Sequence, residues 1–181
     1  MAETGFTFAG SGAVNTTGPF SSGTSWNNPG RVVANNNSNA DLNLPSSSTG
    51  LFASNFGLAV PAGATIDGVE TRTRRLITGG MGSASSRYIR LAVASTATSG
   101  TANDNTTGWA TSEEVITDGS PTDTWEELLT AAICNATGFG YILDVTTGGP
   151  FGAAEVDSME INVHYTAAVG GASNLIILGA G

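Results

Sequence analysis

An alternation of apolar and polar residues constrains the fold of this chain more than any other feature. It recurs in residues 65–77, 87–94, 139–145 and 159–165. Because successive side chains of a β-strand point to opposite faces, each segment is expected to form a half-buried strand. The side chains expected in the core are Val69, Ile89, Leu91, Phe139, Leu143, Ile161 and Val163. Those expected to point outward or toward a neighbour are Glu70, Arg72, Arg90, Glu160 and Asn162.

Segments rich in glycine, serine, threonine and asparagine separate the expected strands. Pro61-Ala62-Gly63-Ala64 predicts a turn, and Gly79-Gly80-Met81-Gly82 predicts a hairpin connection between the strands on either side. Further candidates for short strands are residues 4–8, 30–34 and 107–116. Many short strands separated by turns are typical of an all-β protein, and we expect a two-sheet antiparallel sandwich that is jelly-roll-like.

One segment departs from the strand pattern and predicts a short helix over residues 123–134. Asp123 or Thr124 suits the N-cap position, and Glu126-Glu127 follows in the first turn, where the helix dipole favours negative charge. An apolar stripe runs along the segment, formed by Trp125, Leu128, Leu129 and Ile133. Together these features predict the one helix of the chain.

The chain is expected to contain one domain with extended ends. We place a β-sandwich domain at residues 26–166, between an N-terminal arm at 1–25 and a C-terminal arm at 167–181. Four adjacent apolar residues of the C-terminal arm are expected to add to a sheet edge or groove of a neighbouring subunit. Folding back as a final strand of the same domain is the alternative. The residues expected at an interface are Phe6, Phe8, Leu175, Ile176, Ile177 and Leu178.

The charge balance argues against several classes of partner. The chain has a net charge of −9, and its 6 cationic residues are all arginines. Such a surface repels nucleic acid and anionic membranes, so neither is expected as a partner. No secretory signal or membrane-spanning segment is visible. Arg72, Arg74 and Arg75 are expected to pair with acidic residues of neighbouring strands, with anion recognition as the alternative.

Candidate catalytic residues are few. His164 is the one histidine and Cys134 the one cysteine, so neither a structural zinc site nor an intrachain disulfide is expected. His164 falls on the polar face of its strand, and no Gly-x-Ser-x-Gly nucleophile turn accompanies it, so an ordinary surface or sheet residue is expected. Cys134 is expected to be a small buried hydrophobe rather than a nucleophile.

Two pairs of adjacent glutamates and one polar loop are the remaining candidates for a site. Glycoside hydrolysis needs two carboxylates across a sugar, and Glu113-Glu114 and Glu126-Glu127 supply carboxylates. A strand edge and a first helical turn explain these pairs more simply. Asn103-Asp104-Asn105 forms a polar loop tip, where a weakly held cation is the alternative to a plain loop. We expect no catalytic residue, no metal and no cofactor.

Several segments in succession carry a family resemblance. They are Trp26-Asn27-Asn28-Pro29, Asn55-Phe56-Gly57, residues 60–70, Trp109 with Thr111-Ser112-Glu113, Asp123-Thr124-Trp125, Gly138-Phe139-Gly140 and residues 156–165. This succession resembles a β-sandwich domain common among virion proteins of tailed bacteriophages, in heads, tails and fibres. The resemblance covers about residues 26–166, and residues 60–70 are its most specific part. It implies a structural or adhesive role in a virus particle.

Three functional hypotheses follow. The first is a non-enzymatic virion protein that binds the outer surface of a phage head as a capsid cement or decoration protein. The second is a tail or fibre component that binds a host receptor or a glycan, and a hydrolytic enzyme ranks last. The expected partners are the major capsid protein or other virion subunits, in a virion assembled in the host cytoplasm. The chain itself is expected to form a homo-oligomer, with a trimer favoured.

Overall fold

The computed structural model describes residues 1–17, 20, 22–43, 47–79, 82–98, 100, 107–149 and 152–168. The strands are, in chain order, β1 (Ala2–Glu3), β2 (Thr7–Phe8), β3 (Ser11–Asn15), β4 (Ala40–Asn43), β5 (Gly50–Ser54), β6 (Thr65–Thr78), β7 (Ser83–Val93), β8 (Thr96–Ala97), β9 (Glu114–Ser120), β10 (Gly140–Gly148) and β11 (Ala153–Thr166). The helical segments whose bounds are described are the 3₁₀ helix η2 (Pro29–Val32) and the α-helix α1 (Ala131–Cys134). Neither of them, nor any other helix in the described residues, has the length and apolar character needed to cross a membrane.

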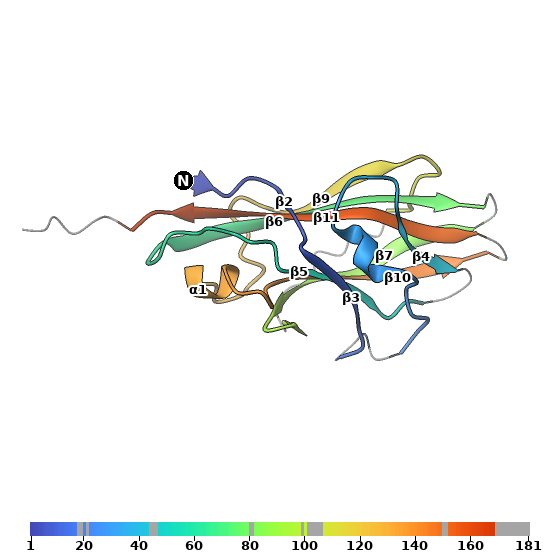
Figure 1. Ribbon diagram of the computed structural model, residues 1–181, viewed down its shortest axis with the longest axis horizontal. Coiled ribbons are helices and arrows are strands. Elements are labelled where there is room, and N and C mark those ends of the chain that lie inside the picture. The colour runs from blue at the N-terminus through green and yellow to red at the C-terminus, as the bar shows by residue number, and fades with distance from the viewer. Residues whose placement is uncertain are drawn as a thin grey trace, which may run out of the picture.

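The strands form two antiparallel sheets that lie one above the other (Figure 1). Sheet A has the order β1-β11-β6-β9, with β2 and β4 also paired to β11, and sheet B has the order β3-β5-β10-β7-β8. The pairs β4–β11, β5–β10, β6–β9 and β7–β8 are nested along the chain. Nested pairing distributed over two sheets is the strand arrangement of a jelly roll. The predicted all-β sandwich is confirmed.

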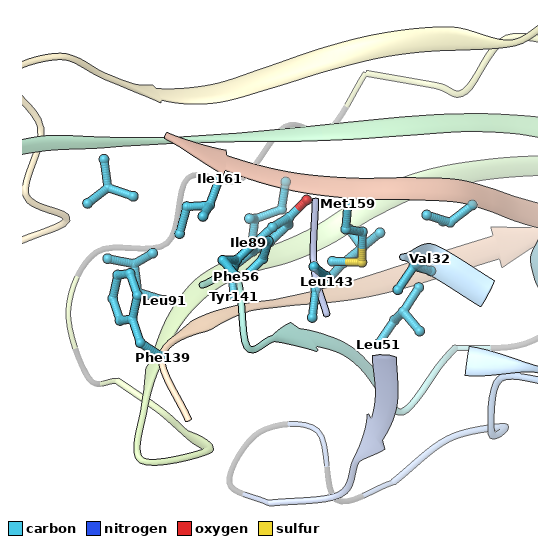
Figure 2. Close-up of a cluster of buried hydrophobic side chains, with 14 of the residues drawn as sticks. Val32, Leu51, Phe56, Ile89, Leu91, Phe139, Tyr141, Leu143, Met159 and Ile161 are labelled. Carbon is cyan, nitrogen blue, oxygen red and sulfur yellow. The ribbon is translucent and has the colours of Figure 1, made fainter. Parts of the chain in front are cut away.

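The core lies between the sheets and is formed by their inward-facing side chains (Figure 2). Met159 and Ile161 project from sheet A toward the side chains of sheet B, among them Leu143. All the side chains that the alternation places in the core are buried, namely Val69, Ile89, Leu91, Phe139, Leu143, Ile161 and Val163. The predicted strand register is therefore correct, since a slip of one residue would turn each of them outward.

The N-terminal residues belong to the sandwich. β1 and β2 pair with β11, and β3 pairs with β5, so the segment contributes to both sheets (Figure 1). Without this pairing, the edges of β11 and β5 would leave more backbone N–H and C=O groups without hydrogen-bond partners. The paired structure thus begins at residue 2 rather than at residue 26. Gly5, with φ of 72°, interrupts the strand expected over residues 4–8.

The helix expected over residues 123–134 is wrong for most of its length. Trp125 and Glu126 have φ values of 58° and 57°, which a right-handed helix does not use. The Trp125 indole is buried instead and donates a hydrogen bond to the Val69 carbonyl at 2.9 Å. Only α1 remains helical, and its N-cap residue Thr130 accepts a hydrogen bond from the Ile133 amide at 3.2 Å. Tertiary burial of the indole has overridden the local helical pattern.

Three further local predictions are corrected by the sheet arrangement. β6 and β7 are not the two arms of a hairpin across residues 79–82, because β6 lies in sheet A and β7 in sheet B. The strand expected over residues 30–34 is replaced by η2, in which proline occupies the first turn. The strand expected over residues 107–116 begins only at Glu114, while Trp109 packs in the core.

Candidate functional site

Charged side chains on the outer face of sheet A are paired across strands. Arg72 lies 3.8 Å from the Glu160 carboxylate, and Arg74 lies 2.7 Å from Glu113. The Arg72 guanidinium carbon also lies 3.5 Å from the centre of the Phe6 ring. Burial raises the pKa of Glu160, and the nearby Arg72 and Arg74 oppose that shift. The predicted pairing of these arginines with acidic neighbours is confirmed.

His164 joins three strands on the same face. Its Nε2 lies 2.7 Å from a Glu70 carboxylate oxygen, and its Nδ1 lies 3.6 Å from a Glu3 carboxylate oxygen. Asn162 donates a hydrogen bond to the same Glu3 oxygen at 2.7 Å. His164 is 7% exposed, and Glu160 and Asn162, which were expected to point outward or toward a neighbour, are also buried. The cluster links β1 to β6 and β11 within sheet A, with a hydrogen bond at Nε2 of the imidazole and the Glu3 carboxylate near Nδ1.

Arg75 points into the interior, opposite in direction to Arg74, and is 1% exposed. Its Nε donates to a Glu114 carboxylate oxygen at 3.0 Å, and its Nη1 donates to the Ser86 hydroxyl at 2.8 Å. The guanidinium carbon lies 5.0 Å from the Trp109 ring centre. Burial lowers the pKa of Arg75, and the contact with Glu114 opposes that shift. These contacts tie β6 and β9 of sheet A to β7 of sheet B.

In each pair of neighbouring glutamates, the two carboxylates lie in different environments. Glu113 turns to the outer face and Glu114 to the interior, as their arginine partners require. Glu127 accepts a hydrogen bond from the Gly100 amide at 2.7 Å, whereas Glu126 is exposed. Glycoside hydrolysis needs two carboxylates that face one sugar. Neither pair has that arrangement.

Cys134 and Asn135 stabilise the end of α1. Burial of the Cys134 thiol raises its pKa to about 12, so the thiol stays protonated at neutral pH. Asn135 donates to the Val60 carbonyl at 2.8 Å and accepts from the Val60 amide at 2.9 Å. The predicted burial of Cys134 is confirmed.

The surface has a polar hollow beside η2. It has a volume of about 370 Å³ and is lined by Arg31, Asn37, Ser38, Asn39, Asp41, Ala153 and Glu155. Several of these polar groups already bond to each other or to neighbours. Asp41, for example, accepts hydrogen bonds from Asn27 at 2.8 Å and from Asn28 at 3.3 Å. Across the described part of the chain, no cluster of three or more histidine, cysteine, aspartate or glutamate side chains is arranged to hold a metal ion. The loop at 103–105, considered above for a cation, lies outside the described residues.

A larger hollow lies where the β7–β8 hairpin faces the loop before α1, and we call it the end groove. It has a volume of about 600 Å³ and is lined by Val93, Thr96, Ala97, Thr98, Gly100, Glu126, Glu127, Leu128 and Ile133. Sequence reasoning missed this groove, because it placed Leu128 on the buried stripe of a helix. The backbone at residues 125–126 is left-handed, and this conformation turns Leu128 outward. Glycine or asparagine would have indicated such a conformation, but the sequence has Trp125 and Glu126 there.

The residues expected at an interface fall into two groups. Phe6 is half-buried beneath Arg72, and Phe8 on β2 is 42% exposed. The other members of the prediction, Leu175, Ile176, Ile177 and Leu178, lie outside the described residues.

Some of the segments that carry the family resemblance are joined to other parts of the fold by hydrogen bonds to main-chain atoms. The Trp26 indole donates to the Thr49 carbonyl at 3.1 Å. The Val69 amide donates to the Asp123 carbonyl at 2.9 Å, next to the bond between Trp125 and Val69. The bonds to Val69 hold the loop at residues 123–125 against β6.

Comparison of the chain with models of protein families, with curated proteins and with solved structures finds no match in any of the three. The class defined by the fold is an all-β antiparallel sandwich with jelly-roll strand pairing.

Proposed function

We propose that this chain is a non-enzymatic structural protein of a bacteriophage virion and that it decorates the outer surface of the head. The observation that carries the proposal is the nested strand pairing of a jelly roll in the same residues, 26–166, that resemble phage virion domains. Jelly rolls build viral capsid and lectin domains, among others. The support is an analogy with the fold of viral proteins, and other proteins use the same fold for other functions.

The N-terminal segment supplies a surface for attachment to the capsid. Met1 is 71% exposed and Phe8 is 42% exposed, on a segment that the Arg72 and His164 contacts hold against sheet A. Exposed apolar side chains on a rigid support favour association, because their burial in an interface costs little conformational freedom. We therefore assign the contact with the major capsid protein to this segment.

The experiment adds the purified full-length chain to phage heads that lack it and counts the bound copies by quantitative mass spectrometry. We expect a copy number that follows the symmetry of the head rather than that of a tail. Phe8→Thr should lower the occupancy, whereas Val115→Thr should not, although both positions are 42% exposed. Absence of binding to heads, or equal losses in the two variants, would contradict the proposal.

The C-terminal arm is a second expected contact. If the arm docks on a neighbouring subunit, a chain lacking residues 170–181 should keep its circular dichroism spectrum and thermal unfolding transition but lose occupancy on heads. A collapse of the fold on this deletion would make the segment a strand of its own domain and would remove the docking-arm part of the proposal.

A tail or fibre protein that binds a glycan is the second candidate, and the polar hollow favours it. Its lining combines Arg31, Asp41 and Glu155 with amide side chains, which are groups that hydrogen-bond sugar hydroxyls. A glycan array probed with the native chain and with Asn37→Gly tests this role. Asn37 is exposed and has a φ of 57°, which glycine adopts freely, so loss of its amide should weaken glycan binding without unfolding the chain. An array on which the native chain binds no glycan would exclude the candidate.

A further inference from the structure

The end groove combines an exposed apolar side chain with an unpaired charge. Leu128 is 94% exposed, the highest value among the exposed large hydrophobic residues of the described chain. It stands beside Val93 and Ile133, which are half-buried and also line the groove. An exposed leucine beside a hollow that other apolar side chains also line is typical of a surface that another molecule covers.

Two strained turns flank the groove, and Glu126 of the second turn lines it. Ala94 and Ser95 join β7 to β8 with φ values of 50° and 65°. Trp125 and Glu126 have φ values of 58° and 57°, and the Glu127 amide closes their turn on the Thr124 carbonyl at 3.1 Å. Two successive positive φ values are those of a type I′ turn, which strongly favours asparagine and glycine. Four residues of other types hold this conformation in the two turns next to the groove, and such strain is concentrated at functional sites.

Tertiary contacts hold both turns in place. The buried Trp125 indole is bonded to the Val69 carbonyl, and the Ser95 amide donates to the Gly138 carbonyl at 2.8 Å. Gly100 lies so close to the second turn that a Cβ there would approach the Trp125 carbonyl oxygen to 2.2 Å. The two turns are therefore already ordered, so ligand binding loses little conformational entropy in them.

The charge of the groove selects the kind of ligand. Among the described residues that line it, both charged ones are glutamates, Glu126 and Glu127. Glu127 is held by the Gly100 amide, but Glu126 has no hydrogen-bond or ion-pair partner within the described part of the chain. A second copy of this chain would bring another Glu126 and a net charge of −9 to the contact, so like charges oppose self-association there.

We propose that the end groove binds an extended segment of another protein in which an arginine or lysine lies next to a large apolar side chain. The apolar side chain packs on Leu128, Val93 and Ile133, and the cation meets the Glu126 carboxylate. This site is separate from the N-terminal surface assigned above, and it does not depend on where the protein functions.

The test is a titration of the ¹⁵N-labelled full-length chain, followed by amide chemical shifts. The probe is a blocked peptide with the sequence glycine-leucine-arginine-leucine-glycine, and the control peptide carries glutamate in place of arginine. We expect the arginine peptide to shift the amides of Ala97, Gly100 and Leu128 in a saturable manner, and the glutamate peptide to leave them unchanged. Equal shifts with both peptides, or shifts confined to other surfaces, would overturn the proposal.

Three variants sharpen the result. Glu126→Gln should weaken binding of the arginine peptide about two- to fivefold, as for an exposed ion pair. Leu128→Ser should weaken it roughly tenfold or more, because a buried leucine is lost. Val115→Ser is the matched control on the exposed edge strand β9 and should bind as the native chain does. If Leu128→Ser binds as tightly as Val115→Ser, the groove is not the site. If the same amides shift on concentrating the chain alone, the occupant is a second copy and the proposal is wrong.

Discussion

The pairs Glu113-Glu114 and Glu126-Glu127 show how backbone conformation changes the role of the same two residues. In the first pair the carboxylates part to opposite sides, Glu113 toward the partly exposed Arg74 and Glu114 toward the buried Arg75. In the second pair a left-handed turn leaves Glu126 in solvent, while Glu127 caps the Gly100 amide. Adjacent carboxylates therefore mark neither a catalytic pair nor a helix start unless their backbone conformation is known.

The outer face of sheet A and the end groove differ in how their charges are paired. The outer face of sheet A carries many charges, but they satisfy one another through contacts such as Arg72 with Glu160 and His164 with Glu70. The end groove carries fewer charges, and Glu126 is left for a partner. Internal pairing stabilises a particular strand arrangement, whereas an unpaired charge beside an exposed leucine favours association.

The largest expected effect is the loss of the buried ion pair. Glu114→Gln removes the hydrogen-bonded carboxylate of the buried Arg75 guanidinium and leaves only the charge of Asp118 to compensate it, which should lower the free energy of unfolding by as much as about 3–5 kcal/mol. Glu113→Gln removes a partly exposed pair with Arg74 and should cost at most about 1 kcal/mol. Urea denaturation of both variants measures the contrast. Similar losses in the two variants would show that Arg75 is not the more buried partner in solution.

A pH dependence is expected from Glu160. Its pKa is raised in the folded chain, mainly by burial, so the folded state binds a proton more tightly than the unfolded state. The contribution of Glu160 to stability is therefore fully present below its ordinary pKa of 4.5 and is lost as the pH rises through the raised folded value. Glu160→Gln cannot titrate, so the native chain should lose stability relative to this variant over that window. Unfolding free energies measured from pH 4 to pH 7 test the sign, and a native chain that gains stability relative to the variant would reverse it.

The smallest expected effect concerns the turn of the end groove. Glycine adopts positive φ without a Cβ penalty, so Glu126→Gly should raise the free energy of unfolding by about 0.5–1 kcal/mol. Glu126→Val places a β-branched residue there and should lower it by about 1 kcal/mol. Glu126→Gln, which keeps the shape of the side chain, is the control and should be neutral. Thermal unfolding curves of the three variants rank them, and a destabilising glycine would mean that the turn is not left-handed in solution.

Much of the fold follows from the alternation of residue types. The strands around Val69, Leu91, Leu143 and Ile161 and the faces that they bury are readable because one buried face enforces a period of two. The same pattern does not indicate which strands share a sheet. The hairpin predicted at residues 79–82 is therefore wrong, because β6 before them lies in sheet A and β7 after them lies in sheet B.

The sequence by itself determined the all-β class, the strand register, the burial of Cys134 and the neutralisation of the arginine cluster. Each of these depends on residue type at a fixed spacing, which local chemistry is sufficient to interpret. Only the tertiary structure decided that the N-terminal residues complete both sheets, that His164 is buried beneath them, and that Trp125 leaves a helical pattern to bond Val69. The reason is that burial of an indole and satisfaction of sheet edges are gained only when distant segments meet, and these gains exceed the local preferences of a few residues.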